Sequence, residues 1–177
     1  MSEKDIVAVR HLVESLLQSG MAPDSGQLSQ LSASIAKLFS VAPDEVAILA
    51  LDQKQQSLGF VLPEQLAAVG AIPLSSTSAL AARTARERKP QLTNSFPSMR
   101  HATVFEGVPL GRDSADVIQK ILSAPILDGS SVIGVVQISR KGATAASAGP
   151  DFTPKDLQML IALSPVLEKI LKLGRKS

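Results

Sequence analysis

The sequence predicts an α+β fold built on an antiparallel sheet. Apolar residues recur at helical spacing near both ends of the 177-residue chain. Between the two ends lie two pairs of short apolar runs, each pair joined by a polar turn, which is the pattern of antiparallel hairpins. Helices at the ends with hairpins between them are typical of an α+β domain, and the length fits one domain of ordinary size.

Two helices are expected before the first strand. Gly20 follows the first apolar stripe at the place of a helix C′ residue, and Asp24 or Ser25 can cap the second helix at its start. The apolar positions of the two stripes are Ile6, Val9, Val13, Leu16, Leu17, Leu28, Leu31, Ile35, Leu38 and Phe39. Val7 and Leu12 widen the first stripe beyond what one small domain needs, which indicates a partner surface.

The two hairpins form the centre of the predicted sheet. Their four apolar runs are residues 46–51, 58–62, 123–127 and 132–138. Asp128-Gly129 is a strong two-residue turn signal between the strands of the second hairpin. Gly134 interrupts a β-branched run, so we expect a helix or another backbone to approach the strand closely at this position.

The rest of the chain predicts a short helix, an irregular segment and a final helix. Residues 79–88 have good helix propensity, and residues 91–94 fit a short strand. Residues 95–114 contain two prolines and two glycines, which favours a loop. Thr153 and Asp156 have the spacing of a capping box, so the final helix is expected to begin there.

Composition excludes several classes of function. The chain has no cysteine, and therefore no disulfide, thiolate metal site or cysteine nucleophile. With 18 Lys and Arg against 16 Asp and Glu, and 3% aromatic residues, it lacks the basic face and stacking rings of a nucleic-acid binder. His11 and His101 are too isolated to form a metal site. No apolar stretch is long enough to span a bilayer, so we expect no membrane contact. The absence of cysteine favours a cytoplasmic protein, and we expect no cofactor.

Four stretches of the chain resemble the GAF domain, a small-molecule sensory and regulatory family. They correspond to the family's opening strand, its helix and short strand, its most recognisable hairpin and its entry into the final helix. These stretches are residues 44–52, 75–93, 124–138 and 152–157. The likeness spans residues 24–172, so one GAF-like domain is expected over residues 1–177, with a dimerisation helix in residues 1–22.

The resemblance also limits the ligands to be expected. Cyclic-nucleotide-binding members carry an Asn-Lys and a Phe-x-x-x-Asp-Glu signature. Phe152 and Asp156 keep part of this signature, but Leu157 replaces the Glu and Ser139-Arg140 stands where Asn-Lys would be. Bilin-linked members and the free methionine-sulfoxide reductases of the family use cysteines, which this chain lacks. The chain is therefore expected to belong to none of these groups.

The resemblance places the ligand between the sheet and the irregular middle of the chain. Hydroxyls and backbone N–H groups of Ser75, Ser76 and Thr77 could bind an anion there. Arg100 and Arg112 could add charge-assisted hydrogen bonds to a carboxylate or phosphate. In the alternative interpretation, the three hydroxyl residues are ordinary helix caps and the two arginines are solvated surface groups.

The expected function follows from this resemblance. It implies a stand-alone sensor or regulatory domain. We expect this domain to be non-catalytic, because no set of nucleophile, base and orienting group can be read from the sequence. The terminal helices of GAF proteins commonly pair, so the resemblance implies a homodimer that acts through a separate signalling partner. The alternative is a protein-interaction or scaffold domain with a degenerate, empty pocket.

Overall fold

The computed structural model describes residues 3–96 and 117–175. Its helices are α1 (Glu3–Ser19), α2 (Ser25–Phe39), α3 (Leu80–Glu87) and α5 (Pro154–Arg175), with two 3₁₀ turns, η1 (Pro43–Glu45) and η2 (Glu64–Leu66). Its strands are β1 (Val46–Asp52), β2 (Ser57–Leu62), β3 (Ala71–Pro73), β4 (Gln91–Thr93), β5 (Val117–Asp128) and β6 (Ser131–Gly142). The six strands form one antiparallel sheet in the order β3-β2-β1-β6-β5-β4. This confirms the predicted α+β class.

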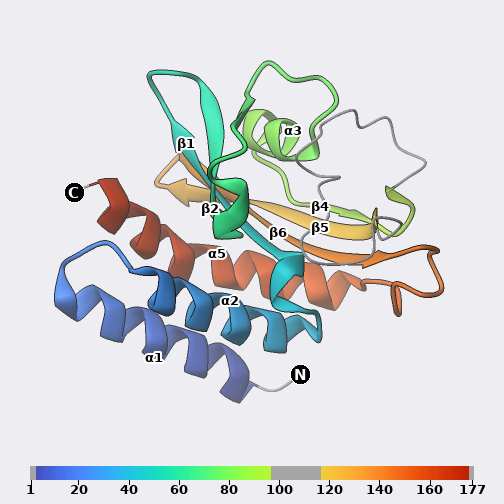
Figure 1. Cartoon of the computed structure of the whole chain (residues 1–177), viewed down its shortest axis with the longest axis horizontal. Coiled ribbons are helices and arrows are strands. Elements are labelled where there is room, and N and C mark those ends of the chain that lie inside the picture. Colours follow the sequence, from blue (N-terminus) through green and yellow to red (C-terminus); the bar gives the residue numbers. More distant parts are fainter. Residues whose placement is uncertain (1–2, 97–116, 176–177) are drawn as a thin grey trace.

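The helices divide between the two faces of the sheet. Figure 1 shows α1, α2 and α5 on one face and α3 on the other. On the three-helix face, α1 packs against both α2 and α5, and the core beneath them is aliphatic apart from two phenylalanines. None of the helices in residues 3–96 and 117–175 is long and apolar enough to cross a bilayer.

Helix ends follow the capping signals of the sequence. Gly20 closes α1 with φ +68°, and its N–H donates to Leu17 O. Asp24 caps α2, because its Oδ1 accepts from Gln27 N at 2.8 Å while Gln27 Oε1 accepts from Asp24 N at 2.9 Å. The same reciprocal arrangement joins the backbone N–H groups and side chains of Thr153 and Asp156 at the start of α5.

Helix α5 continues through an internal proline. Pro165 has no N–H, so the carbonyl of Ile161, four residues earlier, lacks its usual helical donor. The hydroxyl of Ser164 donates to Ile161 O at 2.9 Å in its place. A neighbouring side chain therefore satisfies the carbonyl that the proline leaves open.

The β5–β6 hairpin is longer than the sequence pattern predicts. Asp128 pairs with Ser131 across the expected two-residue turn, where Gly129 has φ +61°. Each strand has 12 residues, however, and both continue well beyond the predicted apolar runs. The extensions include polar residues that are buried, such as Gln119 and Lys141, which interrupt the apolar pattern that marks a strand in the sequence.

Arg140 connects β6 to the helical face. Its guanidinium donates to Phe39 O at 3.2 Å and Ser40 O at 3.1 Å, the last carbonyls of α2. The same group stacks over the Phe152 ring, 4.7 Å from the ring centroid, just before α5 begins. One side chain thus holds the end of α2 and the start of α5 against the sheet.

Gly134 lies at a close contact between α5 and the sheet, as its place in the sequence predicts. A Cβ built at this position would overlap the carbonyl oxygen of Leu49 and lie 2.5 Å from Leu171 Cδ1. Leu171 belongs to α5, so the helix side chain occupies the space that a side chain at residue 134 would need. The close approach therefore requires glycine here.

We expect Gly134→Ala to destabilise the protein by about 1–3 kcal/mol, because a backbone carbonyl cannot move aside as a flexible side chain can. Gly59→Ala is the matched control, since a Cβ there meets nothing within 4 Å. Urea denaturation of both variants measures the free energies of unfolding. Equal losses in the two variants would contradict the packing argument.

Candidate functional site

The α3 face of the sheet carries buried polar side chains on adjacent strands. Gln137 of β6 pairs with Ala47 of β1 on one side and with Ser123 of β5 on the other. Ser139 and Lys141 follow at alternate positions of β6, so the three side chains share one face. Gln137 is 4% exposed and Ser123 is fully buried. Polar groups in an aliphatic core are costly unless they are hydrogen-bonded, so this patch needs an explanation.

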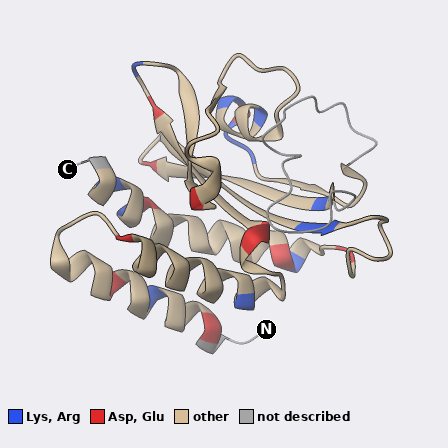
Figure 2. Ribbon diagram, viewed as in Figure 1, with Lys and Arg blue, Asp and Glu red and all other residues tan. Residues whose placement is uncertain are grey.

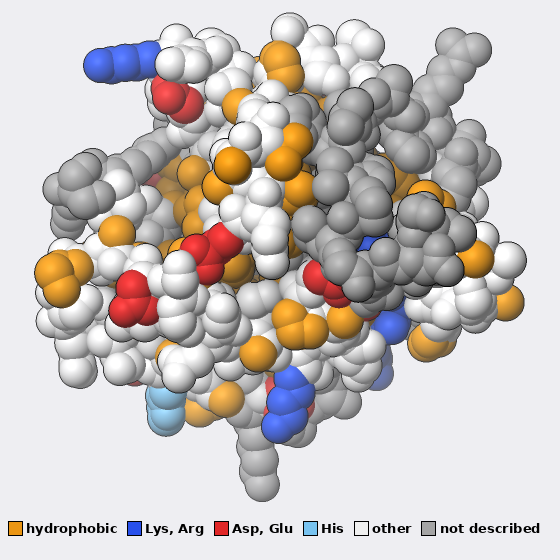
Figure 3. Space-filling model, in the orientation of Figure 1, with side chains coloured by type: hydrophobic (Ala, Val, Ile, Leu, Met, Phe, Trp, Pro, Cys, Tyr) orange, Lys and Arg blue, Asp and Glu red, His pale blue; other side chains and the backbone are white. Residues whose placement is uncertain are grey.

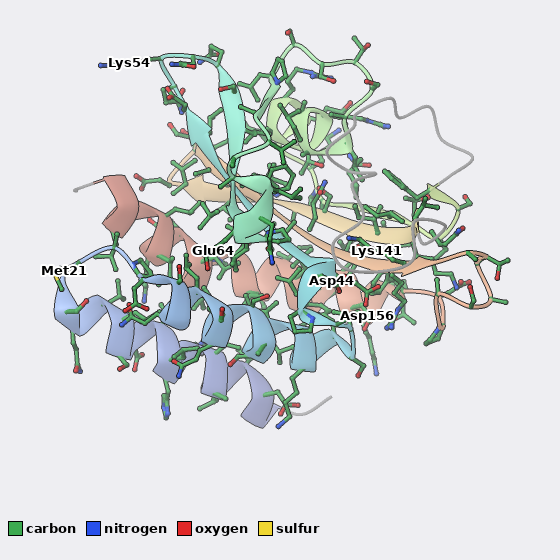
Figure 4. All side chains as sticks on the ribbon, in the orientation of Figure 1. Met21, Asp44, Lys54, Glu64, Lys141 and Asp156 are labelled. Atoms are coloured by element: carbon green, nitrogen blue, oxygen red, sulfur yellow. The ribbon has the colours of Figure 1, made fainter. Side chains whose placement is uncertain are left out.

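Charged groups of η1 hold one end of the patch. Glu45 Oε2 accepts from the backbone N–H of Lys141 at 2.6 Å, and its Oε1 accepts from Ala42 N at 2.9 Å. The ammonium of Lys141 donates to Asp44 O at 3.3 Å. Figure 2 shows opposite charges gathered where η1, β6 and the start of α5 meet, and Figure 4 labels Asp44 and Lys141 in this region.

Helix α3 is fastened to the same patch by hydroxyl groups. Thr84 Oγ1 donates to Leu80 O at 2.8 Å, within the helix, and lies 2.8 Å from Ser123 Oγ. Gln137 Nε2 lies 3.2 Å from Ser123 Oγ. Thr84 and Ser123 are fully buried, and Gln137 nearly so. A continuous hydrogen-bonded row therefore runs from α3 across β5 to β6.

A small cavity lies over this patch. It has a volume of about 30 Å³, enough for two or three atoms, since one water-sized atom needs roughly 10–15 Å³ measured in this way. Its described walls are Asp44, Glu45, Ala47, Phe60, Pro63, Leu66, Ile118, Ile121, Gln137, Ser139 and Lys141. Within residues 3–96 and 117–175, no three histidine or acidic side chains gather as a metal ion would require. Polar and apolar groups thus converge on a space suited to a small polar group.

A larger groove lies on the opposite face, beside the β1–β2 hairpin. It has a volume of about 850 Å³, and its floor includes Ala50, Gly59 and Ala71, which are in register on β1, β2 and β3. Ile170 and Leu171 of α5 form one wall. Figure 3 shows hydrophobic side chains in the hollow beside the hairpin, and Figure 4 labels Lys54 at the tip of the hairpin. The groove is mainly apolar.

An ion-pair network joins α5 to the β5–β6 turn. Lys172 Nζ lies 2.7 Å from Glu168 Oε1 on the same helix and 3.0 Å from Asp128 Oδ1 at the β5–β6 turn. Hydrogen bonds to Glu168 and then to Asp128 raise the pKa of Lys172 above its ordinary value. Because Lys172 is charged in the folded protein, the network fastens the last turns of α5 to the hairpin.

The hydroxyl residues predicted as anion ligands do not line either cavity. Ser76 Oγ accepts from Ala79 N at 3.1 Å in the turn before α3, while the N-cap of that helix is Ala79 and has no side-chain capping bond. Arg86 donates to the carbonyls of Leu74 and Ser76, which fixes the same loop, while Ser75 and Thr77 are exposed. Arg100 and Arg112, the two predicted lid arginines, lie outside the described residues. Their ligand role stays a prediction.

The polar patch was missed from the sequence, although a signal was present. Gln137 and Ser139 are polar residues on either side of Ile138 after a run of apolar residues, although Arg140 breaks the alternation before Lys141. A period of two in polar residues indicates one distinct face of a strand. What the sequence could not show is that α3 and η1 cover this face, so that the polar side chains become buried.

The sequence profile of the GAF domain matches residues 26–171. The chain belongs to the GAF domain family. No curated protein matches the chain closely enough to be reported as a relative.

Solved structures show that the fold is shared across this family. The GAF domain of an Acinetobacter phosphoenolpyruvate-protein phosphotransferase has a TM-score of 0.70 at 15% identity, and covers 99% of this chain and 98% of its own. The corresponding domain from Coxiella burnetii has a TM-score of 0.66 at 12% identity, with coverage of 99% and 98%. Free methionine-R-sulfoxide reductase from Neisseria meningitidis, solved with its substrate, has a TM-score of 0.62 at 16% identity, with coverage of 99% and 95%.

We expect Glu45→Ala to lower the free energy of unfolding by about 2 kcal/mol, because two backbone N–H groups of the patch lose their acceptor. Glu64→Ala is the control, since the exposed Glu64 accepts only from the hydroxyl of Ser25 among the hydrogen bonds found here. Thermal and urea unfolding report both changes. A loss in Glu45→Ala no larger than in the control would argue against its anchoring role.

Proposed function

We propose that this GAF domain is a regulatory module that binds a small molecule at the cavity on the α3 face of the sheet. The observation that carries the proposal is the convergence of polar residues from η1 and β6 on one cavity. Ligand sites commonly combine apolar walls with a few placed polar groups in this way. Membership of a family of sensory and regulatory domains supports the same site.

We propose further that the domain is non-catalytic. Similar structures include methionine-R-sulfoxide reductases, so the fold itself is compatible with catalysis. Sulfoxide reduction by protein thiols requires cysteine, and this chain has none. Binding without chemical change is then the simplest function for the cavity, with the signal passing to a separate protein.

An interaction domain with an empty pocket is the second candidate. The observation in its favour is the contrast in size between the two hollows, about 30 Å³ at the polar patch and about 850 Å³ at the apolar groove. In that case the groove, and not the cavity, is the functional surface. The two candidates place ligand binding on opposite faces of the sheet, so single substitutions can separate them.

The cavity hypothesis is tested with Ala47→Val, because Ala47 lines the cavity and the added methyl groups occupy it. We expect a ligand found by native mass spectrometry, or by a thermal-shift screen of nucleotides, carboxylates and amphiphiles, to raise the melting temperature of the wild type and of Ala50→Val, but not of Ala47→Val. Ala50→Val is the matched control, since Ala50 is on the same strand but lines the groove. A ligand shift abolished by Ala50→Val and kept by Ala47→Val would favour the groove.

The homodimer through the terminal helices remains part of the proposal, although much of the apolar surplus of α1 packs within the chain. Leu12 and Leu17 contact the core, whereas Val7 is 41% exposed and Ile161 of α5 is 39% exposed. These two side chains offer apolar area to a second copy, at the helices that the family commonly uses.

We expect sedimentation equilibrium at micromolar concentration to give twice the mass of one chain. The double variant Val7→Lys with Ile161→Lys is expected to be monomeric, because lysine would have to be desolvated in the interface. Val69→Lys, at a position that is 47% exposed away from these helices, is the control and should remain dimeric. A monomeric wild type would remove the dimer from the proposal.

A further inference from the structure

The hydroxyl row between α3 and β6 has only one consistent proton order. Leu80 O can only accept, so the single hydroxyl proton of Thr84 is directed to it. Thr84 Oγ1 must then accept from Ser123, which uses the single hydroxyl proton of Ser123. Ser123 Oγ therefore has only lone pairs left for Gln137. The amide nitrogen, and not the amide oxygen, must face Ser123.

This order fixes the orientation of the Gln137 amide, which is otherwise ambiguous by a half-turn. With Nε2 held by Ser123, the carbonyl oxygen Oε1 points away from the row. No hydrogen bond to Oε1 is found among the described residues. Among the same residues, Arg140 Nε is the one side-chain polar atom that is both fully buried and without a hydrogen-bond partner. Oε1 therefore lacks a partner but is not fully buried. Because Gln137 is only 4% exposed and lines the cavity, the oxygen is accessible from the cavity.

The acceptor on the cavity wall favours a donor over an anion. An anionic group placed beside Gln137 would meet the lone pairs of its carbonyl oxygen. A group that donates a hydrogen bond would satisfy an acceptor that is costly to leave buried without a partner.

We propose that the cavity recognises a small uncharged hydrogen-bond donor, such as the N–H of a primary amide, and that Gln137 is the residue that determines this specificity. The proposal rests on the function proposed above, in which the cavity binds the ligand. Ser123 and Thr84 act as positioning residues, because they set which end of the amide the ligand meets. An anion is the ligand class that this arrangement disfavours.

Formamide and formate provide a matched pair of probes, since both have three non-hydrogen atoms and differ in an amide N–H₂ against a charged oxygen. NMR titration of the nitrogen-15-labelled protein at constant ionic strength follows the Gln137 side-chain amide and the Ser139 backbone amide. We expect formamide to shift both signals with a dissociation constant about tenfold lower than that of formate, the scale of one hydrogen bond.

Gln137→Met removes the carbonyl acceptor at similar length and should abolish the preference for formamide, as read from the Ser139 signal. Gln119→Met is the control, because Gln119 is also a buried glutamine, its amide donates to Gly142 O, and it does not line the cavity. Ser123→Ala should weaken the preference by freeing the Gln137 amide to turn. Each of these results, with the preference kept in Gln119→Met, supports the proposal.

Other results would overturn it. Formate binding as tightly as formamide at these signals would show that the cavity binds small molecules without the donor preference, which leaves the proposed function intact. A preference that survives Gln137→Met would remove Gln137 from the recognition. If neither probe shifts the signals, the donor specificity is wrong, while the Ala47→Val and Ala50→Val comparison still tests separately whether the cavity is the ligand site.

Discussion

The three central strands, β1, β5 and β6, are covered on both faces, and the rest of the architecture follows from this constraint. One face requires a thick aliphatic layer, which α2 and α5 supply with α1 packed over both. The other face is covered by the shorter α3, whose buried alanines, Ala81, Ala82 and Ala85, let it lie close to the sheet. With 3% aromatic residues, the core depends on close packing of small and branched side chains, and Gly134 is the clearest instance.

The sequence was sufficient wherever a structural signal is local. Asp128-Gly129 specifies its turn within two residues, and Thr153 with Asp156 specifies the start of α5 within four. Features that depend on contacts with distant segments of the chain could not be predicted from the sequence. The three-residue strand β3 has no pattern of its own, and it exists because β2 offers a free edge. The polar patch could not be predicted for the same reason, since the polar residues of β6 become buried only when α3 and η1 cover them.

Polar residues near a helix start are common, and their local chemistry does not separate a cap from a ligand. Ser76 illustrates this, because its hydroxyl is used by the backbone N–H of Ala79. Gln137 has no distinctive local signal in the sequence, yet the hydroxyls of Thr84 and Ser123, which are distant in the chain, orient its side chain. Identities of 12–16% to solved GAF domains accompany a shared fold. Differences in function within a shared fold reside in particular side chains, and not in the course of the backbone.

Arg140 and Lys141 are adjacent residues of β6 whose side chains serve opposite faces of the sheet. Neighbouring residues of a strand point to opposite faces, so one peptide bond separates the guanidinium that holds α2 and α5 from the ammonium beside the cavity. The backbone that holds the helical layer in place is therefore continuous with the backbone at the cavity wall, through a single peptide unit.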